Sequence, residues 1–158
     1  TRKLYDFADG NKSISLRSTD YTHSLSNLAR IDRFVALNSA IEVDLTGQVN
    51  AEVANGVYVG AVGGAVDFLR GAHHSRGGMP IVALPSSIKT SQGPRSRIVN
   101  ILNGPVSTSR ADAGIIVTDH GVADLRHLTV SERQRAMIAI AAPEFREELE
   151  RNSRGSAT

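Results

Sequence analysis

Short apolar segments that alternate with helical patterns restrict the folds open to this chain. Strands are predicted at residues 14–18, 34–37, 41–45, 57–59, 80–84, 97–102 and 113–117. Helices are predicted at residues 24–31, 65–72, 123–126, 129–142 and 144–151, with a loop at residues 85–94. Strands that alternate with helices are typical of an α/β fold, so we expect a layered open sheet with flanking helices.

The length and composition favour one domain. The chain has 158 residues, of which 41% are hydrophobic, and this is enough for a single packed core. We expect the domain to span residues 1–151 and residues 152–158 to form a disordered tail. Because the sequence begins at Thr1 rather than Met, we expect a processed product or a piece of something longer.

Several classes of protein are disfavoured by what the sequence lacks. No apolar run approaches the roughly 20 residues of a membrane span, and no secretory leader begins the chain, so we expect a cytoplasmic protein without membrane contact. The absence of cysteine excludes disulfides and thiolate chemistry.

The charge of the chain is only mildly positive. The net charge is +2 with scattered basic residues, and the aromatic residues are four Phe and three Tyr, without Trp. Nucleic-acid interfaces carry clustered basic residues, so we expect no nucleic-acid partner. A small positive excess suits a polyanionic small molecule instead.

Residues 60–64, with the sequence Gly-Ala-Val-Gly-Gly, form a glycine turn between a predicted strand and a predicted helix. Glycine permits positive φ and lets a ligand approach the backbone closely. The free N–H groups at the start of a helix suit a phosphate or an oxyanion. The turn lacks the Lys-Ser/Thr ending of a P-loop and the full dinucleotide pattern. From spacing alone, an anion site and a plain tight turn both remain open.

Four titratable residues suggest metal or acid/base chemistry at first sight. His73 and His74 are adjacent, and adjacent helical residues point about 100° apart, so they chelate one ion poorly. No further ligands stand at zinc spacing, so we expect no metal site and a surface or hydrogen-bonding role for both. Glu42 and Asp44 share one face of a predicted strand. An acid/base pair is open to them, and a plain polar strand face is the favoured interpretation.

Two other polar residues lie where a ligand could be bound. Asp119 follows the predicted strand at residues 113–117 and precedes a predicted helix, where a carboxylate can act in catalysis or cap the helix. Lys89 lies in the predicted loop, where its ammonium group could reach a phosphate or remain solvated. No Gly-x-Ser-x-Gly elbow is present to complete a serine triad.

Seven motifs occur in order along the chain. They are NSAIEVDLTGQVN at 38–50, GGAVDF at 63–68, RGA at 70–72, ALPS at 83–86, SRIV at 96–99, IVTDHGVADLR at 116–126 and APEFR at 142–146. This set resembles the C-terminal domain of the acetyl-CoA hydrolase/transferase family, which includes acetate and 4-hydroxybutyrate CoA-transferases. The resemblance covers nearly the whole chain, and the ordered set is far more specific than any single motif.

The resemblance implies a CoA-transferase-like fold and an acyl-group exchange on coenzyme A. In the family, a glutamate attacks the thioester and carries CoA as a glutamyl thioester, which a carboxylate or water then resolves. That glutamate belongs to the part of the family's chain upstream of this domain, and this sequence has no match for its motif. The resemblance therefore implies half of an enzyme that acts on acyl-CoA and a carboxylate, needs an N-terminal domain, and is expected to form a homo-oligomer.

The resemblance also implies roles for particular residues. The glycine turn matches a family loop that lies against CoA near the thioester, so Gly60, Gly63 and Gly64 are expected to bind CoA. The Gly64 N–H is also expected to act as an oxyanion donor. Four further positions are implied as site residues: Ile41 through a backbone contact with CoA, Lys89 close to the cofactor, Asp119 beside the nucleophile, and His23 at the edge of the active site.

Two positions depart from the family pattern, and two other functions remain open. Gly60 stands where some members have Asn, and Asp119 stands where many have the longer Glu. One alternative function is a stand-alone module that binds CoA or a nucleotide without catalysis. The other is weak nucleic-acid binding, which a flat salt dependence of binding would exclude.

Overall fold

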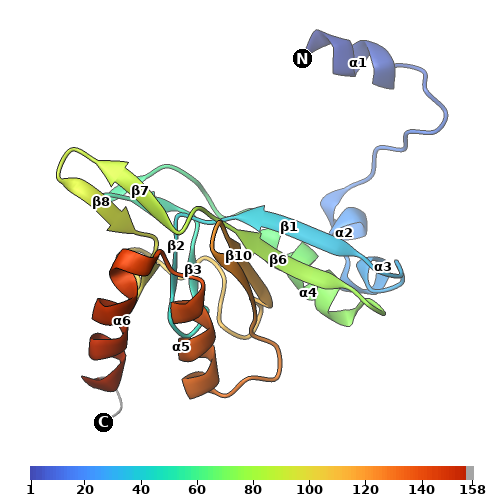
Figure 1. The fold of residues 1–158 in the computed structure, drawn as a ribbon. Helices are drawn as coiled ribbons and strands as arrows, with labels where there is room; N and C mark the ends of the chain where they lie inside the picture. Colours follow the sequence, from blue (N-terminus) through green and yellow to red (C-terminus); the bar gives the residue numbers. More distant parts are fainter. Residues whose placement is uncertain (156–158) are drawn as a thin grey trace.

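The computed structural model describes residues 1–155 and has a four-stranded sheet at its centre (Figure 1). Its strands, in the order β1-β6-β10-β11, are β1 (Val35–Ser39), β6 (Met79–Ala83), β10 (Ile115–Thr118) and β11 (Gly121–Asp124). Strands β1, β6 and β10 are parallel, and β11 pairs antiparallel with β10. The carboxyl ends of the three parallel strands therefore meet at one edge of the sheet, where ligands of α/β folds commonly bind.

A smaller sheet and two hairpins extend the structure. The smaller sheet has three strands in the order β3-β2-β9, namely β2 (Glu42–Asp44), β3 (Val49–Asn50) and β9 (Ile98–Val99). The hairpins are antiparallel and consist of β4 (Val53–Ala54) with β5 (Val57–Tyr58) and β7 (Ser87–Thr90) with β8 (Gly93–Ser96).

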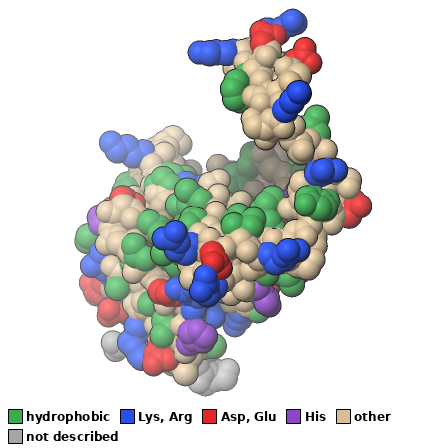
Figure 2. Space-filling view, turned by 90° about the vertical axis from the view of Figure 1, so that its right-hand side faces the viewer, with side chains coloured by type: hydrophobic (Ala, Val, Ile, Leu, Met, Phe, Trp, Pro, Cys, Tyr) green, Lys and Arg blue, Asp and Glu red, His purple; other side chains and the backbone are tan. Residues whose placement is uncertain are grey.

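The helices lie outside the sheets. They are α1 (Arg2–Ala8), α2 (Thr19–Thr22), α3 (Leu25–Leu28), α4 (Ala65–His74), α5 (Val130–Ala139) and α6 (Pro143–Gly155). Helix α4 packs against β1 and β6, and α5 packs against β11 and α6. Helix α1 has no buried residue and stands clear of the body (Figures 1 and 2). No helix within residues 1–155 is long and apolar enough to cross a membrane.

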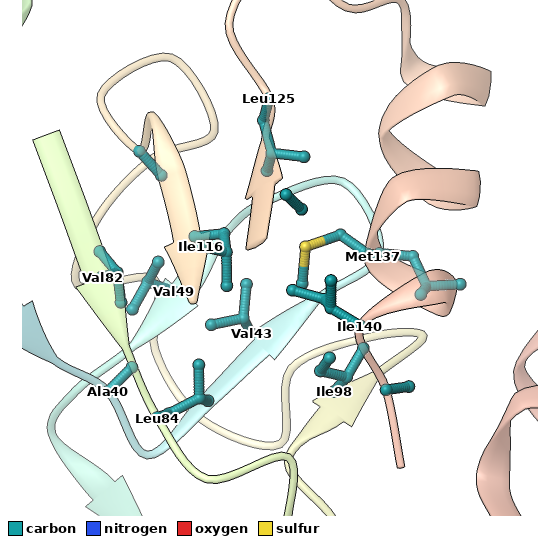
Figure 3. Close-up of a cluster of buried hydrophobic side chains, with 14 of the residues drawn as sticks. Ala40, Val43, Val49, Val82, Leu84, Ile98, Ile116, Leu125, Met137 and Ile140 are labelled. Atoms are coloured by element: carbon teal, nitrogen blue, oxygen red, sulfur yellow. The ribbon is translucent and has the colours of Figure 1, made fainter. Parts of the chain in front are cut away.

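One hydrophobic core joins the two sheets to the helices (Figure 3). Val82 and Ile116 from the four-stranded sheet meet Val43 from the smaller sheet, and Met137 of α5 closes the cluster. Each of these side chains is at most 1% exposed. The predicted α/β fold with a layered open sheet is therefore confirmed.

The last two helices begin as the sequence predicts. The Thr129 hydroxyl accepts from the Glu132 N–H at 3.4 Å, and the Glu132 carboxylate accepts from the Thr129 N–H at 2.8 Å, so a capping box opens α5. Pro143 opens α6, where its missing N–H has no helical partner to lose. Helix α6 continues to Gly155, so the predicted tail does not begin at residue 152, and residues 156–158 lie outside the described residues.

Two predicted elements are wrong because tight turns fold the chain back on itself. The predicted loop at residues 85–94 overlaps the β7–β8 hairpin. Gly93 closes this hairpin with φ of +110°, and its carbonyl accepts from the Thr90 hydroxyl at 2.7 Å. The predicted helix at residues 123–126 is replaced by β11, because Gly121, with φ of +147°, turns the chain back along β10. Asp119 therefore cannot cap a helix there.

The predicted strand at residues 14–18 is also wrong. These residues form no regular element, and Leu16 is 94% exposed. A strand needs a neighbour to satisfy its main-chain groups, and the described residues bring none to this segment. Alternating sequence alone was therefore a misleading signal here.

A buried amide, Asn50, holds the smaller sheet to the first hairpin. Asn50 is 0% exposed, and its Nδ2 donates to Glu42 Oε1 at 3.1 Å and to the Val53 carbonyl at 2.8 Å. Its Oδ1 accepts from the N–H groups of Glu52 and Val53, both at 3.0 Å. Glu42, 4% exposed, also accepts from the N–H of Asn103 at 2.6 Å. Every polar atom of the Asn50 side chain is thus engaged.

We expect Asn50→Ala to lower the free energy of unfolding by about 3 kcal/mol or more, because each buried polar group left without a partner costs about 1–3 kcal/mol. Urea denaturation measures this loss. Gln92→Ala, at the exposed turn of the β7–β8 hairpin, is the control and should change stability by less than about 0.5 kcal/mol. Equal effects of the two substitutions would contradict the role given to Asn50.

Candidate active site

The carboxyl edge of the four-stranded sheet gathers loops from distant parts of the sequence. Gly63 and Ala65, where α4 begins, line one cavity with Asn38 and Ser39, where β1 ends. This cavity has a volume of about 130 Å³. The start of α4 therefore lies at the edge where the sequence predicts a site.

Two positions of the glycine turn, Gly60 and Gly64, require glycine because other atoms lie very close to them, and not because their φ is positive. A Cβ on Gly60 would lie 2.6 Å from the Ala51 carbonyl oxygen, and the Gly60 N–H donates to the Glu52 carbonyl at 3.1 Å. Gly64 has φ of −77°. It is the N-cap of α4, whose first turn has no side-chain cap in the part of the chain that the structure describes. The first N–H groups of α4 are therefore available to a ligand.

His23 lies directly against the glycine turn. A Cβ on Gly64 would lie 2.1 Å from His23 Nε2, so the imidazole occupies the space that a side chain would need. The ring is held from two sides. Its Nδ1 is 2.9 Å from the Thr22 hydroxyl, and its centroid is 4.7 Å from that of Phe68. The structure thus brings His23 and Gly64 together although 40 residues of sequence separate them.

Asp119 lies at the same edge of the sheet, in the turn after β10. Its Oδ1 accepts from the Ser86 N–H at 2.6 Å, and its Oδ2 accepts from the Ser86 hydroxyl at 3.2 Å. The Ser86 N–H holds the pKa of the Asp119 carboxyl below its usual range, and His120, with Nε2 3.4 Å away, acts in the same direction. Asp119 is exposed, and it lines a hollow of about 380 Å³ with Ala83 and Val117.

Ile41 lies elsewhere, in a cavity of about 310 Å³ between the two hairpins. Its N–H donates to the Asn50 carbonyl at 2.9 Å, and its carbonyl accepts from Arg97 Nε at 2.6 Å. Both main-chain groups therefore already have protein partners, and only the second lone pair of the carbonyl is open to a ligand. Arg95 and Arg97 also line this cavity, together with Glu42, whose carboxylate lies 3.8 Å from the Arg95 guanidinium.

Lys89 is exposed on β7, opposite Pro94 of β8. The neighbouring Ile88 lines the Ile41 cavity. Adjacent residues of a strand point to opposite faces, so the Lys89 side chain leaves β7 on the side away from that cavity. The structure therefore brings Lys89 to neither the Ile41 cavity nor the glycine turn.

The other titratable pairs have structural partners. His73 and His74 lie 3.0 Å and 2.9 Å from the carbonyls of Asp112 and Arg70, which confirms their hydrogen-bonding role. Asp44, 3% exposed, accepts from the N–H groups of Thr46 and Gln48 and closes the β2–β3 turn, while Glu42 belongs to the Asn50 cluster. Within residues 1–155 no three His, Cys, Asp or Glu residues are placed to hold a metal.

Three supporting residues were missed from the sequence. Ser86 is 0% exposed and directly follows Leu84-Pro85 after β6. A hydroxyl side chain just after a predicted strand is a pattern that could have identified Ser86. Thr22 supports His23 from the preceding position of the chain, and Phe68 reaches it from α4, a contact that no local pattern indicates.

We expect Gly64→Ala to destabilise the protein by about 1–3 kcal/mol, because the new methyl group displaces His23. Gly63→Ala is the matched control, since a Cβ there meets nothing within 4 Å. Combining Gly64→Ala with His23→Ala should recover most of the loss, and a double-mutant cycle of unfolding free energies measures that recovery. Strictly additive effects would show that the two residues do not compete for space.

The hydrogen bonds of Asp119 should make stability depend on pH. A lowered folded-state pKa stabilises the native state above the ordinary Asp pKa of about 3.9, and this stabilisation is lost as pH falls through the lowered value. We therefore expect wild type to be more stable than Asp119→Ala at neutral pH, with the difference shrinking at acid pH. Denaturation across the acidic range tests this. A difference independent of pH would contradict it.

Comparison with known proteins identifies the family of this chain. The acetyl-CoA hydrolase/transferase C-terminal domain family matches residues 1–153. The 4-hydroxybutyrate coenzyme A transferase of Clostridium kluyveri is 42% identical over 151 residues, which are 94% of this chain and 35% of that protein.

Solved structures agree with the sequence match. RipA from Yersinia pestis has a TM-score of 0.87 at 34% identity and covers 99% of this chain and 34% of its own. The 4-hydroxybutyrate CoA-transferase from Porphyromonas gingivalis has a TM-score of 0.78 at 39% identity, over 98% of this chain and 35% of its own. The chain thus spans about a third of the length of these relatives. It belongs to the acetyl-CoA hydrolase/transferase family and corresponds to the C-terminal domain of that family.

Proposed function

We propose that this chain is the C-terminal part of an enzyme that transfers CoA between an acyl-CoA and a carboxylate, or hydrolyses acyl-CoA. The nucleophile is a glutamate in residues upstream, which carries CoA as a glutamyl thioester. One observation carries the proposal. In a chain of this family, Gly64 and Asp119 both lie at the carboxyl edge of the four-stranded sheet.

In this proposal the glycine turn holds the thioester. The first N–H groups of α4 have no capping side chain, so they can donate to the thioester oxygen as negative charge develops on it. His23 lies beside Gly64 and borders the same position. Gly60 holds the turn in place through its bond to Glu52.

Asp119 has a different role from the glycine turn. Because its pKa is held below the usual range, the carboxylate stays ionised at neutral pH and is a poor proton donor. It therefore acts as a fixed hydrogen-bond acceptor that positions the upstream nucleophile or the attacking group. Ser86 fixes the direction of its oxygens.

The remainder of CoA extends toward the cavity between the hairpins. Ile41 lines this cavity. The two guanidinium groups of the cavity, of Arg95 and Arg97, outnumber its one carboxylate, of Glu42, which suits the phosphates of CoA. Lys89 is exposed on the neighbouring hairpin with its side chain on the side away from this cavity, so it is left out of the proposed phosphate contacts. The small-molecule partners are an acyl-CoA and a carboxylate, the domain partner is the upstream part of the same enzyme, and the assembly is a homo-oligomer.

The first experiment uses the full-length protein. Incubation with acetyl-CoA should release acetate and leave CoA joined as a thioester to a glutamate outside residues 1–158, and mass spectrometry of the protein and its peptides detects the adduct. Adding a carboxylate should remove the adduct and release a new acyl-CoA, whereas loss to water alone identifies a hydrolase. Reversible CoA binding with no adduct would assign a binding module instead.

We expect Asp119→Asn in the full-length enzyme to lower kcat more than it raises KM, because the residue acts on the reacting groups and does not hold the body of CoA. Steady-state kinetics with acyl-CoA measure both constants. Asp124→Asn is the control, since Asp124 lies on the same β10–β11 hairpin and pairs with Arg126. Wild-type kcat in Asp119→Asn would limit Asp119 to a structural role.

A further inference from the structure

The four-stranded sheet has one covered face. Side chains alternate between the two faces of a strand, and paired residues on neighbouring strands share a face. Ala36, Val82, Ile116 and Ala123 point into the core and are each at most 4% exposed. Helix α4, the smaller sheet and α5 contribute to that core.

The opposite face of the sheet exposes apolar side chains on β1, β6 and β11, although Ile115 of β10 is buried on it and Asp124 of β11 pairs there with Arg126. This exposed sheet face carries Val35 and Leu37 on β1, Met79 on β6 and Val122 on β11, which are 52%, 66%, 47% and 65% exposed. Val35 pairs with Met79, and Leu37 pairs with the half-buried Ile81, so the apolar surface is continuous across two strands. Monomeric proteins rarely leave such a surface in water.

Strand β1 adds an unpaired edge to this face. It is the outermost strand of the sheet and pairs only with β6 among the described residues. A strand edge with free main-chain groups is usually paired or covered in native proteins. The exposed sheet face and the β1 edge adjoin each other. Surfaces of both kinds are usually covered in a complete protein.

The N-terminal helix α1 also lacks a surface to pack against among the described residues. Helix α1 has seven residues, none of them buried, and its Leu4, Tyr5 and Phe7 are 60%, 71% and 65% exposed. Figure 2 shows this helix standing clear of the body with hydrophobic and charged side chains together. A helix this short is marginal without packing, so α1 also needs a surface beyond the described residues.

The family match identifies what is missing. The chain corresponds to a C-terminal domain and spans 35% of the Clostridium kluyveri relative, so most of such a protein precedes it. The exposed sheet face also leads into the candidate site, because Ala83 and Val117, which pair on this face, line the same hollow as Asp119. A segment that covers the face therefore lies beside Asp119.

We propose that the exposed sheet face, together with the edge of β1, is the docking surface for the preceding part of the same polypeptide. That part packs apolar side chains on Val35, Leu37, Met79 and Val122. By covering this face it brings its own residues next to Asp119. The use of Asp119 in this argument rests on the proposed function, whereas the docking surface itself rests on exposure and chain length.

Thiol labelling of the full-length protein tests the docking surface. This chain contains no cysteine, so Leu37→Cys and Val122→Cys each introduce one thiol on the face, and peptide mass spectrometry separates them from any upstream cysteine. Ile101→Cys is the matched control, because Ile101 is 77% exposed in the segment after β9, outside the four-stranded sheet. We expect labelling at positions 37 and 122 to be slower than at 101 by about tenfold or more in native protein, and equal in denaturant.

Two results would overturn the proposal. Equal native labelling at all three positions would mean that the face stays open in the whole protein. Protection at position 37 that disappears when the protein is diluted to monomer would make a second copy of the chain the occupant. The CoA adduct experiment is independent, since protection without adduct would reject the enzymatic function and leave the docking surface in place.

Discussion

The structure depends on one buried hydrogen-bonded cluster, centred on Asn50 and Glu42. An uncompensated charge inside a domain is costly, and Glu42 is tolerated because Asn50 and Asn103 donate to it and the Arg95 guanidinium lies 3.8 Å away. The Asn50 amide oxygen also accepts a hydrogen bond from the Glu52 N–H and so fixes the main chain there. The Glu52 carbonyl in turn accepts a hydrogen bond from the Gly60 N–H. The position of the glycine turn at the candidate site is thus set from inside the smaller sheet.

The candidate site combines groups that are fixed in different ways. The N–H groups of α4 are oriented by the helix, and His23 is oriented by Thr22 and Phe68. Asp119 is oriented by a residue just past the end of the neighbouring strand β6, Ser86. These groups supply dipoles and a fixed charge and do not include the nucleophile of the proposed reaction. Such preorganised groups lower a barrier because little rearrangement is needed when charge develops.

The sequence predicted the layered fold and the glycine turn because both follow from local patterns. The strand within residues 41–45 and the capping box at Thr129 were predicted correctly for this reason, although all three residues of β2 are buried and its burial does not alternate. Local patterns did not reveal the hairpin at residues 87–96, since its pairing depends on the conformation of Gly93. They also could not show that Ser86 binds Asp119 or that Lys89 stands apart, because those relations arise only when distant strands become neighbours.

The contact between Gly64 and His23 makes the two positions dependent on each other during sequence divergence. The imidazole fills the volume that any side chain at position 64 would occupy, so the residue at 23 determines which residues position 64 accepts. A side chain that a relative carries at position 64 is therefore incompatible with this chain unless position 23 changes with it. A comparison of relatives that treats each sequence position separately misses this dependence, whereas the short distance between the two residues reveals it.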